Sequence, residues 1–571
     1  MKKFLIGLTI ILLAFFFRFN NLNWDESFHL HPDERFLTMV GQAMKIPSSI
    51  NQYFDQKTSL LNPANIGYRF FVYGRFPLIM TKYLSVGFNL DNYNDLTILG
   101  RQLSAFFDLL IILLVFKTVW LLEKHYKFSS SIKYWASFFY AIAVLPIQLS
   151  HFFAVDTFLN FFMFGSFYFS LKFNYENKIK YLCFSAVFFG LALSCKVTAL
   201  FILPLNLFFI FKSIFKNKFS FRFFISLFVY FVIYLLMSYL ILRLADPYLF
   251  QNPNIFDPTL GQIFVENIKS LKNMTVKDLN NWFPPMVQWL NVNTVLHSLV
   301  NNIVFGLGIP YTILVLIGAL RVVLSFPRKR GSTPLLTILL WVSGFFIYQS
   351  LQATPTLRYF IIIYPFFAIF AAFGINLLIN YGLLITDSKL IRNSLFVILI
   401  IVLLIWPLMF SSIYFHKNTR VEASEWIYKN LPTGSYILSE SWDDSLPLSI
   451  ANNYGKQFVG EQLPIFDPDT PEKWQKINKS LQKADYYILS SNRGWGSIMT
   501  VPEKYPQMSQ FYNELLANKN PDYKKIKEFT SYPSLRYLGI PIDFPDQWSD
   551  ENFTVYDHTK ILIYKHENFY K

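Results

Sequence analysis

Long uninterrupted runs of apolar residues, separated by short basic clusters, make up most of the first 413 residues of the chain. Apolar positions in these runs do not alternate with polar ones, so the runs predict helices that are surrounded by lipid. The first run follows Lys2 and Lys3, and we interpret it as a retained helix because no small-residue cleavage site follows it. Eleven spanning helices are predicted, at residues 4–17, 103–122, 134–150, 157–172, 181–195, 197–211, 223–243, 307–326, 334–350, 359–379 and 393–413.

The pattern changes after residue 413. Val421–Lys429 has helical spacing, and short apolar stretches of strand type follow it. Strands are predicted at 435–439, 485–490 and 559–565. The change predicts two domains: a transmembrane domain, 1–413, with outer loops 20–102 and 244–306, and a soluble α/β domain, 414–571.

Composition strengthens the membrane interpretation. Hydrophobic residues make up 53% of the chain and charged residues 15%, whereas a soluble domain carries about 25% charged residues. The net charge of +15 does not indicate nucleic-acid binding, because the basic residues lie in short clusters between apolar runs. Cys183 and Cys195, if they lie on one helix, are about 18 Å apart, which is too far for a disulfide.

Residues 68–88 decide the orientation of all the helices. This segment is apolar enough to span, but it contains Arg75, Pro77 and Lys82. If it lies along the outer interface instead, the basic clusters all face the cytoplasm, as the positive-inside rule requires. These clusters are Lys124/Lys127/Lys133, Lys172/Lys178/Lys180, Lys212/Lys216/Lys218/Arg222, Arg328/Lys329/Arg330 and Lys389/Arg392. We therefore expect a plasma-membrane protein whose C-terminal domain is extracytoplasmic.

Four carboxylates and two histidines crowd into the first outer loop: Asp25, Glu26, His29, His31, Asp33 and Glu34. Carboxylates close to hydrocarbon are costly unless they are used or paired. Pro32 predicts a helix start, with Asp33 and Glu34 in the first turn. We expect these two to be catalytic, with Asp33 as a general base on an acceptor hydroxyl, and Asp25 and Glu26 in reserve. The structural alternative is a helix N-terminus that merely carries acids.

The two histidines together with Asp33 also suggest a metal site. Residues i and i+2 share a face in an extended chain, but this spacing is not a specific zinc signature. Metal binding therefore ranks below a structural or substrate-orienting role for His29 and His31.

Further motifs follow in order along the membrane region: YGRFPL at 73–78, RQLSAFF at 101–107, PIQLSHFFAVD at 146–156, Lys196 after GLALSC, and Arg358-Tyr359 before Pro365. With the Asp-Glu pair after the first helix, they resemble the GT-C superfamily of glycosyltransferases, specifically glycosyltransferase family 39 with its protein O-mannosyltransferases and aminoarabinose transferases. Arg75 and Phe76 replace the first two positions of the His-Pro-Pro-Leu motif common in that group. The tail segments 440–443 and 551–558 resemble those of bacterial phospholipid-carrier-dependent glycosyltransferases.

The resemblance implies a GT-C-like fold and a lipid-phosphate-sugar-dependent glycosyltransferase of hexosyl- or mannosyltransferase type. Such an enzyme moves a sugar, with inversion, from polyprenyl phosphate to a hydroxyl of a protein, lipid or cell-wall glycan. The lipid-linked sugar is then a co-substrate, and no other cofactor is firmly implied. Residues expected to hold the donor phosphate are Arg358, Lys196, Arg101 and Arg75, and those expected to orient substrates are His29, His31, Asp156 and Tyr359.

Two other classes remain open. A multi-pass transporter or lipid flippase would also explain the intramembrane Asp156 and Lys196, but it does not explain a large outer tail or acids concentrated outside the membrane. A membrane-anchored protein whose tail binds glycan is the third interpretation, and it ranks last.

Overall fold

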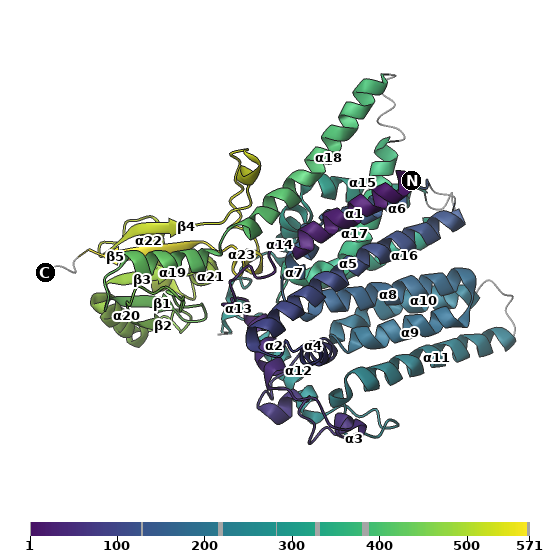
Figure 1. The fold of residues 1–571 in the computed structure, drawn as a ribbon, viewed down its shortest axis with the longest axis horizontal. Helices are drawn as coiled ribbons and strands as arrows, with labels where there is room; N and C mark the ends of the chain where they lie inside the picture. Colours follow the sequence, from purple (N-terminus) through teal and green to yellow (C-terminus); the bar gives the residue numbers. More distant parts are fainter. Residues whose placement is uncertain are drawn as a thin grey trace.

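A bundle of long helices and a separate β-sheet domain meet at one end of the helices (Figure 1). The computed structural model describes residues 2–126, 129–214, 221–280, 283–325, 332–379 and 388–567. The N-terminus lies at the end of the bundle that faces away from the sheet domain. Among the basic residues used above to orient the helices, six lie outside the described residues: Lys127, Lys216, Lys218, Arg328, Lys329 and Arg330.

The membrane domain is built from twelve of the described α-helices and two 3-10 segments. The helices are α1 (Lys2–Phe19), α5 (Tyr93–Tyr126), α6 (Ile132–Ile142), α7 (Val144–Ser150), α8 (Val155–Glu176), α9 (Ile179–Leu193), α10 (Leu203–Ile214), α11 (Phe221–Ala245), α15 (Ile309–Ser325), α16 (Ser332–Ser350), α17 (Tyr364–Leu377) and α18 (Lys389–Ser411). The 3-10 segments η2 (Val197–Ile202) and η5 (Leu357–Ile363) lead into α10 and α17. Cys195 follows the end of α9, so the assumption that it shares a helix with Cys183 is wrong; both cysteines are free thiols.

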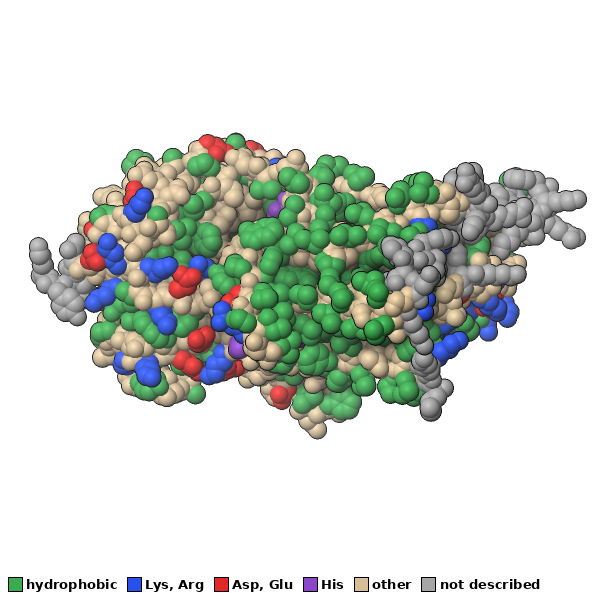
Figure 2. Space-filling view, turned by 90° about the horizontal axis from the view of Figure 1, so that it is seen from above, with side chains coloured by type: hydrophobic (Ala, Val, Ile, Leu, Met, Phe, Trp, Pro, Cys, Tyr) green, Lys and Arg blue, Asp and Glu red, His purple; other side chains and the backbone are tan. Residues whose placement is uncertain are grey.

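The chain is a helical polytopic membrane protein. Among the described residues, six helices are long and apolar enough to cross a membrane, or eight if each of two bent helix pairs counts as one span. Each of the eleven predicted ranges falls largely on a helix, but the number of spans stays a prediction. Large apolar side chains face outward on these helices; Phe228 and Leu324, for example, are each 68% exposed. Figure 2 shows the resulting apolar surface over the helical part, which suits lipid as the solvent.

Short helices cover the end of the bundle that faces the sheet domain. They are α2 (Pro32–Ala43), α3 (Ile50–Phe54), η1 (Pro63–Ile66), α4 (Phe76–Gly87), η3 (Pro247–Leu249), α12 (Gln262–Met274), α13 (Pro284–Val287), α14 (Thr294–Val300) and the π-helical η4 (Asn301–Leu307). The predicted start of α2 at Pro32 is confirmed, with His31 as its N-cap. With 12 residues, α4 is shorter than the ~20 residues of a spanning helix, and Figure 1 shows it nearly end-on beside the long helices.

The C-terminal sheet domain (residues 414–567) has five strands in the order β2-β1-β3-β5-β4. Its elements are η8 (Ser412–Phe415), α19 (Thr419–Asn430), β1 (Tyr436–Glu440), β2 (Val459–Leu463), α20 (Pro471–Lys483), β3 (Tyr486–Leu489), α21 (Arg493–Ile498), α22 (Pro506–Leu516), β4 (Tyr523–Phe529), η9 (Arg536–Leu538), α23 (Glu551–Thr554) and β5 (Ile561–His566). Strands β2, β1 and β3 are parallel, and β5 is antiparallel to β3 and β4. The three predicted strands and the predicted helix are confirmed.

Alternation along the strands builds a core on each face of this sheet. Ile437 and Ile488 pack with α19 on one face, whereas Leu438 and Leu489 pack with α20 and α22 on the other. The segment 550–558, which precedes β5, leaves the sheet and joins the core of the membrane domain through residues such as Phe553 and Tyr556. The sheet domain therefore supplies side chains to the end of the helix bundle.

Candidate active site

Asp33 and Arg358 form the centre of the candidate site. Asp33 lies in the first turn of α2, and Arg358 lies in η5 at the sheet-domain end of α17. The Arg358 guanidinium donates from one terminal nitrogen to Asp33 Oδ2 and from Nε to Asp156 Oδ2, the latter at 2.7 Å. The Asp33 side chain remains 34% exposed, whereas Arg358 and Asp156 are 12% and 3% exposed. Asp33 is thus a paired carboxylate that a second molecule can still reach.

The surroundings keep Asp33 ionised. Burial raises the pKa of its carboxyl group, but the Arg358 guanidinium opposes this effect and, with His31 and Tyr73, lowers the pKa to about 2. A carboxylate held this firmly by a cation is a weak base. The Asp33 carboxylate becomes a stronger base only if Arg358 pairs with another anion instead.

Lys196 completes a four-charge cluster around Arg358. Its Nζ lies 3.4 Å from Asp156 Oδ1 and 4.3 Å from the centre of the Tyr359 ring. Asp33 and Asp156 together balance Arg358 and Lys196, so the cluster carries no net charge. The cluster therefore brings together four predicted site residues, Asp33, Asp156, Lys196 and Arg358, with Tyr359 against one edge.

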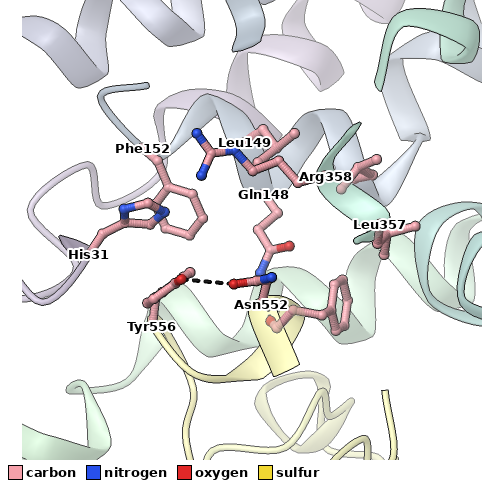
Figure 3. Close-up of a pocket in the computed structure, with 10 residues that line it drawn as sticks. His31, Gln148, Leu149, Phe152, Leu357, Arg358, Asn552 and Tyr556 are labelled. Carbon is pink, nitrogen blue, oxygen red and sulfur yellow. Dashed lines mark hydrogen bonds between the residues drawn. The ribbon is translucent and has the colours of Figure 1, made fainter. Parts of the chain in front are cut away.

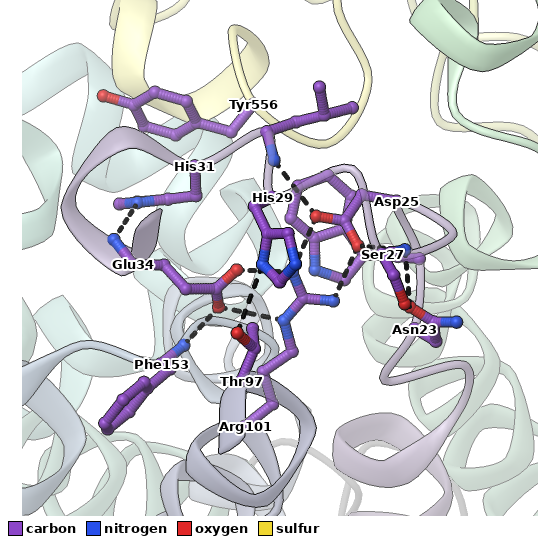
Figure 4. Close-up of polar contacts among 12 residues, drawn as sticks. Asn23, Asp25, Ser27, His29, His31, Glu34, Thr97, Arg101, Phe153 and Tyr556 are labelled. Carbon is purple, nitrogen blue, oxygen red and sulfur yellow. Dashed lines mark hydrogen bonds and ion pairs between the residues drawn. The ribbon is translucent and has the colours of Figure 1, made fainter. Parts of the chain in front are cut away.

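The second acid of the pair, Glu34, points elsewhere. Its carboxylate accepts from Arg101 Nε at 2.9 Å and from the Phe153 backbone N–H at 2.7 Å. The same guanidinium also holds both oxygens of Asp25, at 3.0 and 2.8 Å (Figure 4). It lies 4.9 Å from the centre of the Trp24 ring. Arg101, Asp25 and Glu34 are all fully buried. Successive residues of a helix point about 100° apart, which explains why neighbouring acids face different partners.

Three more predicted residues lie apart from the Arg358 cluster. His29 is buried between Asn94 and Thr97, at 2.8 and 3.1 Å from its ring nitrogens. Arg75 is buried in a pair with Asp246, at 3.1 Å. Glu26 is exposed on the loop surface.

Arg75 belongs to a tight contact between two segments. The Gly74 and Phe76 N–H groups donate to the Cys195 and Ser194 carbonyls at 2.9 and 3.2 Å. A Cβ at Gly74 would lie 2.0 Å from the Ser194 oxygen, so only glycine fits there. This contact fixes the chain on both sides of the cluster, because Tyr73 and Lys196 adjoin it.

A small pocket, called the inner pocket, adjoins Arg358 (Figure 3). His31, Gln148, Phe152, Arg358, Asn552 and Tyr556 are among its lining residues. Tyr556 packs on His31 with ring centres 4.1 Å apart and donates to Asn552 Oδ1 at 2.8 Å. Gln148 donates to the Phe553 carbonyl at 2.7 Å and to Asp557 at 3.0 Å. The sheet domain thus forms one wall of the inner pocket.

His31 is held as a neutral ring. Burial lowers the pKa of His31 to about 3, although Asp33 beside it acts in the opposite direction. Its Nδ1 accepts from the Glu34 backbone N–H at 3.3 Å, which assigns the proton to Nε2. His31 therefore caps α2 and offers one N–H donor on its other edge.

Gln148, Asn552 and Tyr556 were not predicted as site residues. Gln148 lies inside the quoted motif 146–156, and the other two lie inside the tail segment 551–558, so a sequence signal existed for both segments. Their types gave no hint of a common pocket, since about 400 residues separate Gln148 from the tail. Among the described residues, no group of three or more His, Cys, Asp or Glu side chains is arranged to hold a metal ion.

Residues 98–248 match the family model described as dolichyl-phosphate-mannose-protein mannosyltransferase. The resemblance to this family is therefore confirmed. The mannosyltransferase-like segment contributes Arg101, Gln148, Asp156, Lys196 and Asp246 to the contacts described above, while Asp33, Arg358 and Tyr556 lie outside it. No curated protein matches the chain.

Solved structures offer similarity over nearly the whole length. The chain is similar to the archaeal oligosaccharyltransferase AglB from Archaeoglobus fulgidus, solved in complex with an inhibitory peptide and a dolichol-phosphate. The two chains are 11% identical, the match covers 98% of this chain and 88% of that chain, and the TM-score is 0.49. It is also similar to ArnT from Cupriavidus metallidurans, in the apo state at 12% identity with a TM-score of 0.45 and bound to undecaprenyl phosphate at 13% with 0.43, each covering 98% of this chain and 97% of that chain.

Proposed function

We propose that this protein is a membrane glycosyltransferase that moves a sugar from a polyprenyl-phosphate donor to an acceptor hydroxyl on the extracytoplasmic face. The observation that carries the proposal is the partly exposed ion pair between Asp33 and Arg358. It offers a reachable carboxylate and a phosphate-binding guanidinium within one site, at the end of the membrane helices. The family match of residues 98–248 supports the same class of donor.

Donor binding falls to the cations of the four-charge cluster. A guanidinium presents a planar fork of N–H donors that suits phosphate oxygens, and Lys196 adds a point charge. Arg101 and Arg75 are buried and already paired with buried carboxylates, so a donor phosphate has no access to them. We therefore assign the phosphate to Arg358 and Lys196, and give Arg101 and Arg75 the task of fixing the loops around the cluster.

Phosphate binding and base strength are coupled through Arg358. When a donor phosphate draws the guanidinium, Asp33 loses the partner that lowers its pKa. The pKa of Asp33 then rises from about 2 toward its ordinary value, and its power to accept a proton rises with it. Asp156 keeps its contact with Arg358 Nε and holds the guanidinium in place.

The chemical step is a single displacement. The acceptor oxygen forms a bond to the anomeric carbon, while the bond from that carbon to the phosphate oxygen breaks. The acceptor proton passes to Asp33, and polyprenyl phosphate leaves with the bonding electrons. One such displacement inverts the configuration of the anomeric centre.

Reconstituted protein tests this proposal directly. Vesicles that contain the full chain and one polyprenyl-phosphate sugar at a time, from a panel of sugars, are assayed for released polyprenyl phosphate and for sugar bound to an acceptor. Wild-type protein should cleave one of these donors, and Asp33→Asn should bind that donor without cleaving it. Movement of the intact lipid across the bilayer with no bond cleavage would instead favour a flippase.

A further inference from the structure

A second pocket, called the outer pocket, opens on the far side of Tyr556 between the first outer loop and the sheet domain. Its walls include Pro32 and Arg35 from the loop and Arg420, Trp442, Asp444 and Arg493 from the sheet domain. Tyr556 lines both pockets, so the outer pocket lies next to the inner pocket that Arg358 lines. The outer pocket therefore adjoins the proposed active site but is built from other side chains.

The charges of the outer pocket are matched in pairs. Arg35 contacts Asp444 at 2.8 Å, Arg420 contacts Asp443 at 2.9 Å, and Arg493 contacts Glu551 at 2.6 Å. Guanidinium groups donate hydrogen bonds and carboxylates accept them, so the wall presents both kinds of group. Each of its three arginines is paired with an acid, although Glu551, the partner of Arg493, is not itself a lining residue. This pattern suits a neutral ligand with many hydroxyl groups, because each hydroxyl donates and accepts.

Two features of the outer pocket could contact a ligand: an unused donor on Arg420 and the exposed ring of Trp442. Arg420 is 1% exposed, yet among the described residues its Nε has no hydrogen-bond partner. Trp442 is 47% exposed and adopts a φ of +72°, which is uncommon for a bulky residue. Its carbonyl accepts from Arg493 at 2.7 Å, which helps to hold the backbone in this conformation. Phe283 packs at right angles to the Trp442 ring, with ring centres 6.0 Å apart, and about half of the residue remains exposed. A partly exposed aromatic ring beside paired polar groups is a favourable surface for the apolar face of a sugar ring.

We propose that the outer pocket binds a neutral saccharide of the acceptor, with Trp442 as the stacking surface. This inference rests on the proposed function for its direction: the outer pocket is lined by Pro32, which directly precedes Asp33 in the first turn of α2, so an acceptor seated there lies beside the turn that carries the base. The donor phosphate would occupy Arg358 on the other side of Tyr556. The acceptor is then a glycan or a glycosylated molecule.

Saccharide binding is measurable without any transfer reaction. The full-length protein in detergent is probed by saturation-transfer difference NMR with the methyl glycosides of mannose, glucose, galactose and N-acetylglucosamine. Trp442→Asn removes the ring but keeps a residue type that tolerates positive φ, and Trp442→Tyr retains an aromatic face. Tyr454→Asn is the matched control, because Tyr454 is a 56% exposed aromatic residue at φ +52° in the same domain and does not line the outer pocket.

We expect at least one glycoside to bind wild-type and Tyr454→Asn protein alike. Trp442→Asn should raise its Kd about tenfold, which corresponds to about 1.4 kcal/mol and lies at the upper end of aromatic contacts, and Trp442→Tyr should restore most of the affinity. Absence of binding to wild-type protein, or binding that is unchanged in Trp442→Asn, would overturn the proposal.

Kinetics separate the two sources of sugar and the two proposals. If Trp442→Asn raises the KM for donor rather than for acceptor, the pocket holds the donor's sugar and the acceptor assignment is wrong. If glycosides bind as expected but the protein cleaves no donor, the proposed function fails while the saccharide site stands.

Discussion

Asp33 and Glu34 are adjacent acids in one turn of α2, and the structure predicts opposite consequences for neutralising them. Asp33→Asn removes a carboxylate that is one third exposed, and Arg358 keeps its 2.7 Å contact with Asp156. Glu34→Gln removes a fully buried carboxylate from Arg101 and changes the acceptor of the Phe153 N–H. The first change should act on the rate and the second on stability.

Magnitudes follow from these contacts. Breaking a buried ion pair costs about 3–5 kcal/mol when a charge is left unpaired, but Asp25 still pairs with Arg101 in Glu34→Gln, so a loss of about 2–3 kcal/mol is expected. In Asp33→Asn the removed carboxylate is one third exposed and Arg358 keeps Asp156 as a partner, so the loss should be smaller than in Glu34→Gln and the protein should still fold. Loss of a general base lowers the rate about a hundred- to ten-thousand-fold, which equals about 3–5 kcal/mol of transition-state stabilisation.

The assay compares both variants at equal amounts of folded protein. Thermal midpoints in detergent measure stability, and single-turnover transfer from a polyprenyl-phosphate sugar measures the rate. Glu266→Gln, which removes an exposed acid from α12 on the same side of the membrane domain, serves as the control and should change neither. Near-normal turnover by Asp33→Asn, or a stable Glu34→Gln protein that transfers no sugar, would refute the assignment.

Three further predictions concern the donor, the membrane and pH. Arg358→Lys keeps the charge but loses the fork, so the KM for donor should rise about tenfold or more while the protein still folds; an unchanged KM would contradict donor binding by Arg358. A cysteine at the exposed Ala451, in a Cys183→Ser background, should react with an impermeant thiol reagent in intact cells; labelling only after lysis would reverse the topology. Burial lowers the pKa of His558, but Asp546 and Asp557 raise it to about 10. The ion pairs of protonated His558 therefore stabilise the fold fully below about pH 6.5, and this stabilisation is lost as pH rises through 10. The thermal midpoint should fall over this pH range, and His558→Gln should make the midpoint less dependent on pH.

Much of the fold was predictable because lipid imposes a simple rule on sequence. A run of apolar residues must be helical in hydrocarbon, so the spanning ranges fall on helices, and α18 continues even through Pro407. The number of spans is harder to predict, because short or bent helices such as α9 and the α6–α7 pair have borderline length. The strand pattern at 435–439 predicted β1, but nothing local predicts that β5 would be antiparallel to its neighbours.

The site was predictable in its residue types and only partly in its pairings. The cost of acids next to hydrocarbon singled out Asp33 in the first outer loop, whereas Arg358 and Asp156 were expected as site residues from the resemblance to GT-C glycosyltransferases. Which cation meets which acid depends on helix rotation, and Arg101 was expected to hold phosphate, whereas it lies fully buried between Asp25 and Glu34. Contacts from the tail, such as that between His31 and Tyr556, join residues over 500 positions apart and leave no local pattern.

Charge balance connects the contacts around Arg358 with the steps of the proposed reaction. Without donor, the negative charges of Asp33 and Asp156 balance the positive charges of Arg358 and Lys196. In the proposed reaction a donor phosphodiester would add one negative charge, and the transferred acceptor proton would neutralise Asp33 as the leaving phosphate gains its second charge. Arg358 and Lys196 would then face a dianion with only Asp156 still competing for them. Because bound donor draws Arg358 away from Asp33 and thereby raises the pKa of that carboxyl, the acid limb of kcat should lie at higher pH than that of kcat/KM, which reports the free enzyme with its Asp33 pKa of about 2. Coincident acid limbs in the two profiles would mean that donor binding does not release Asp33 from Arg358.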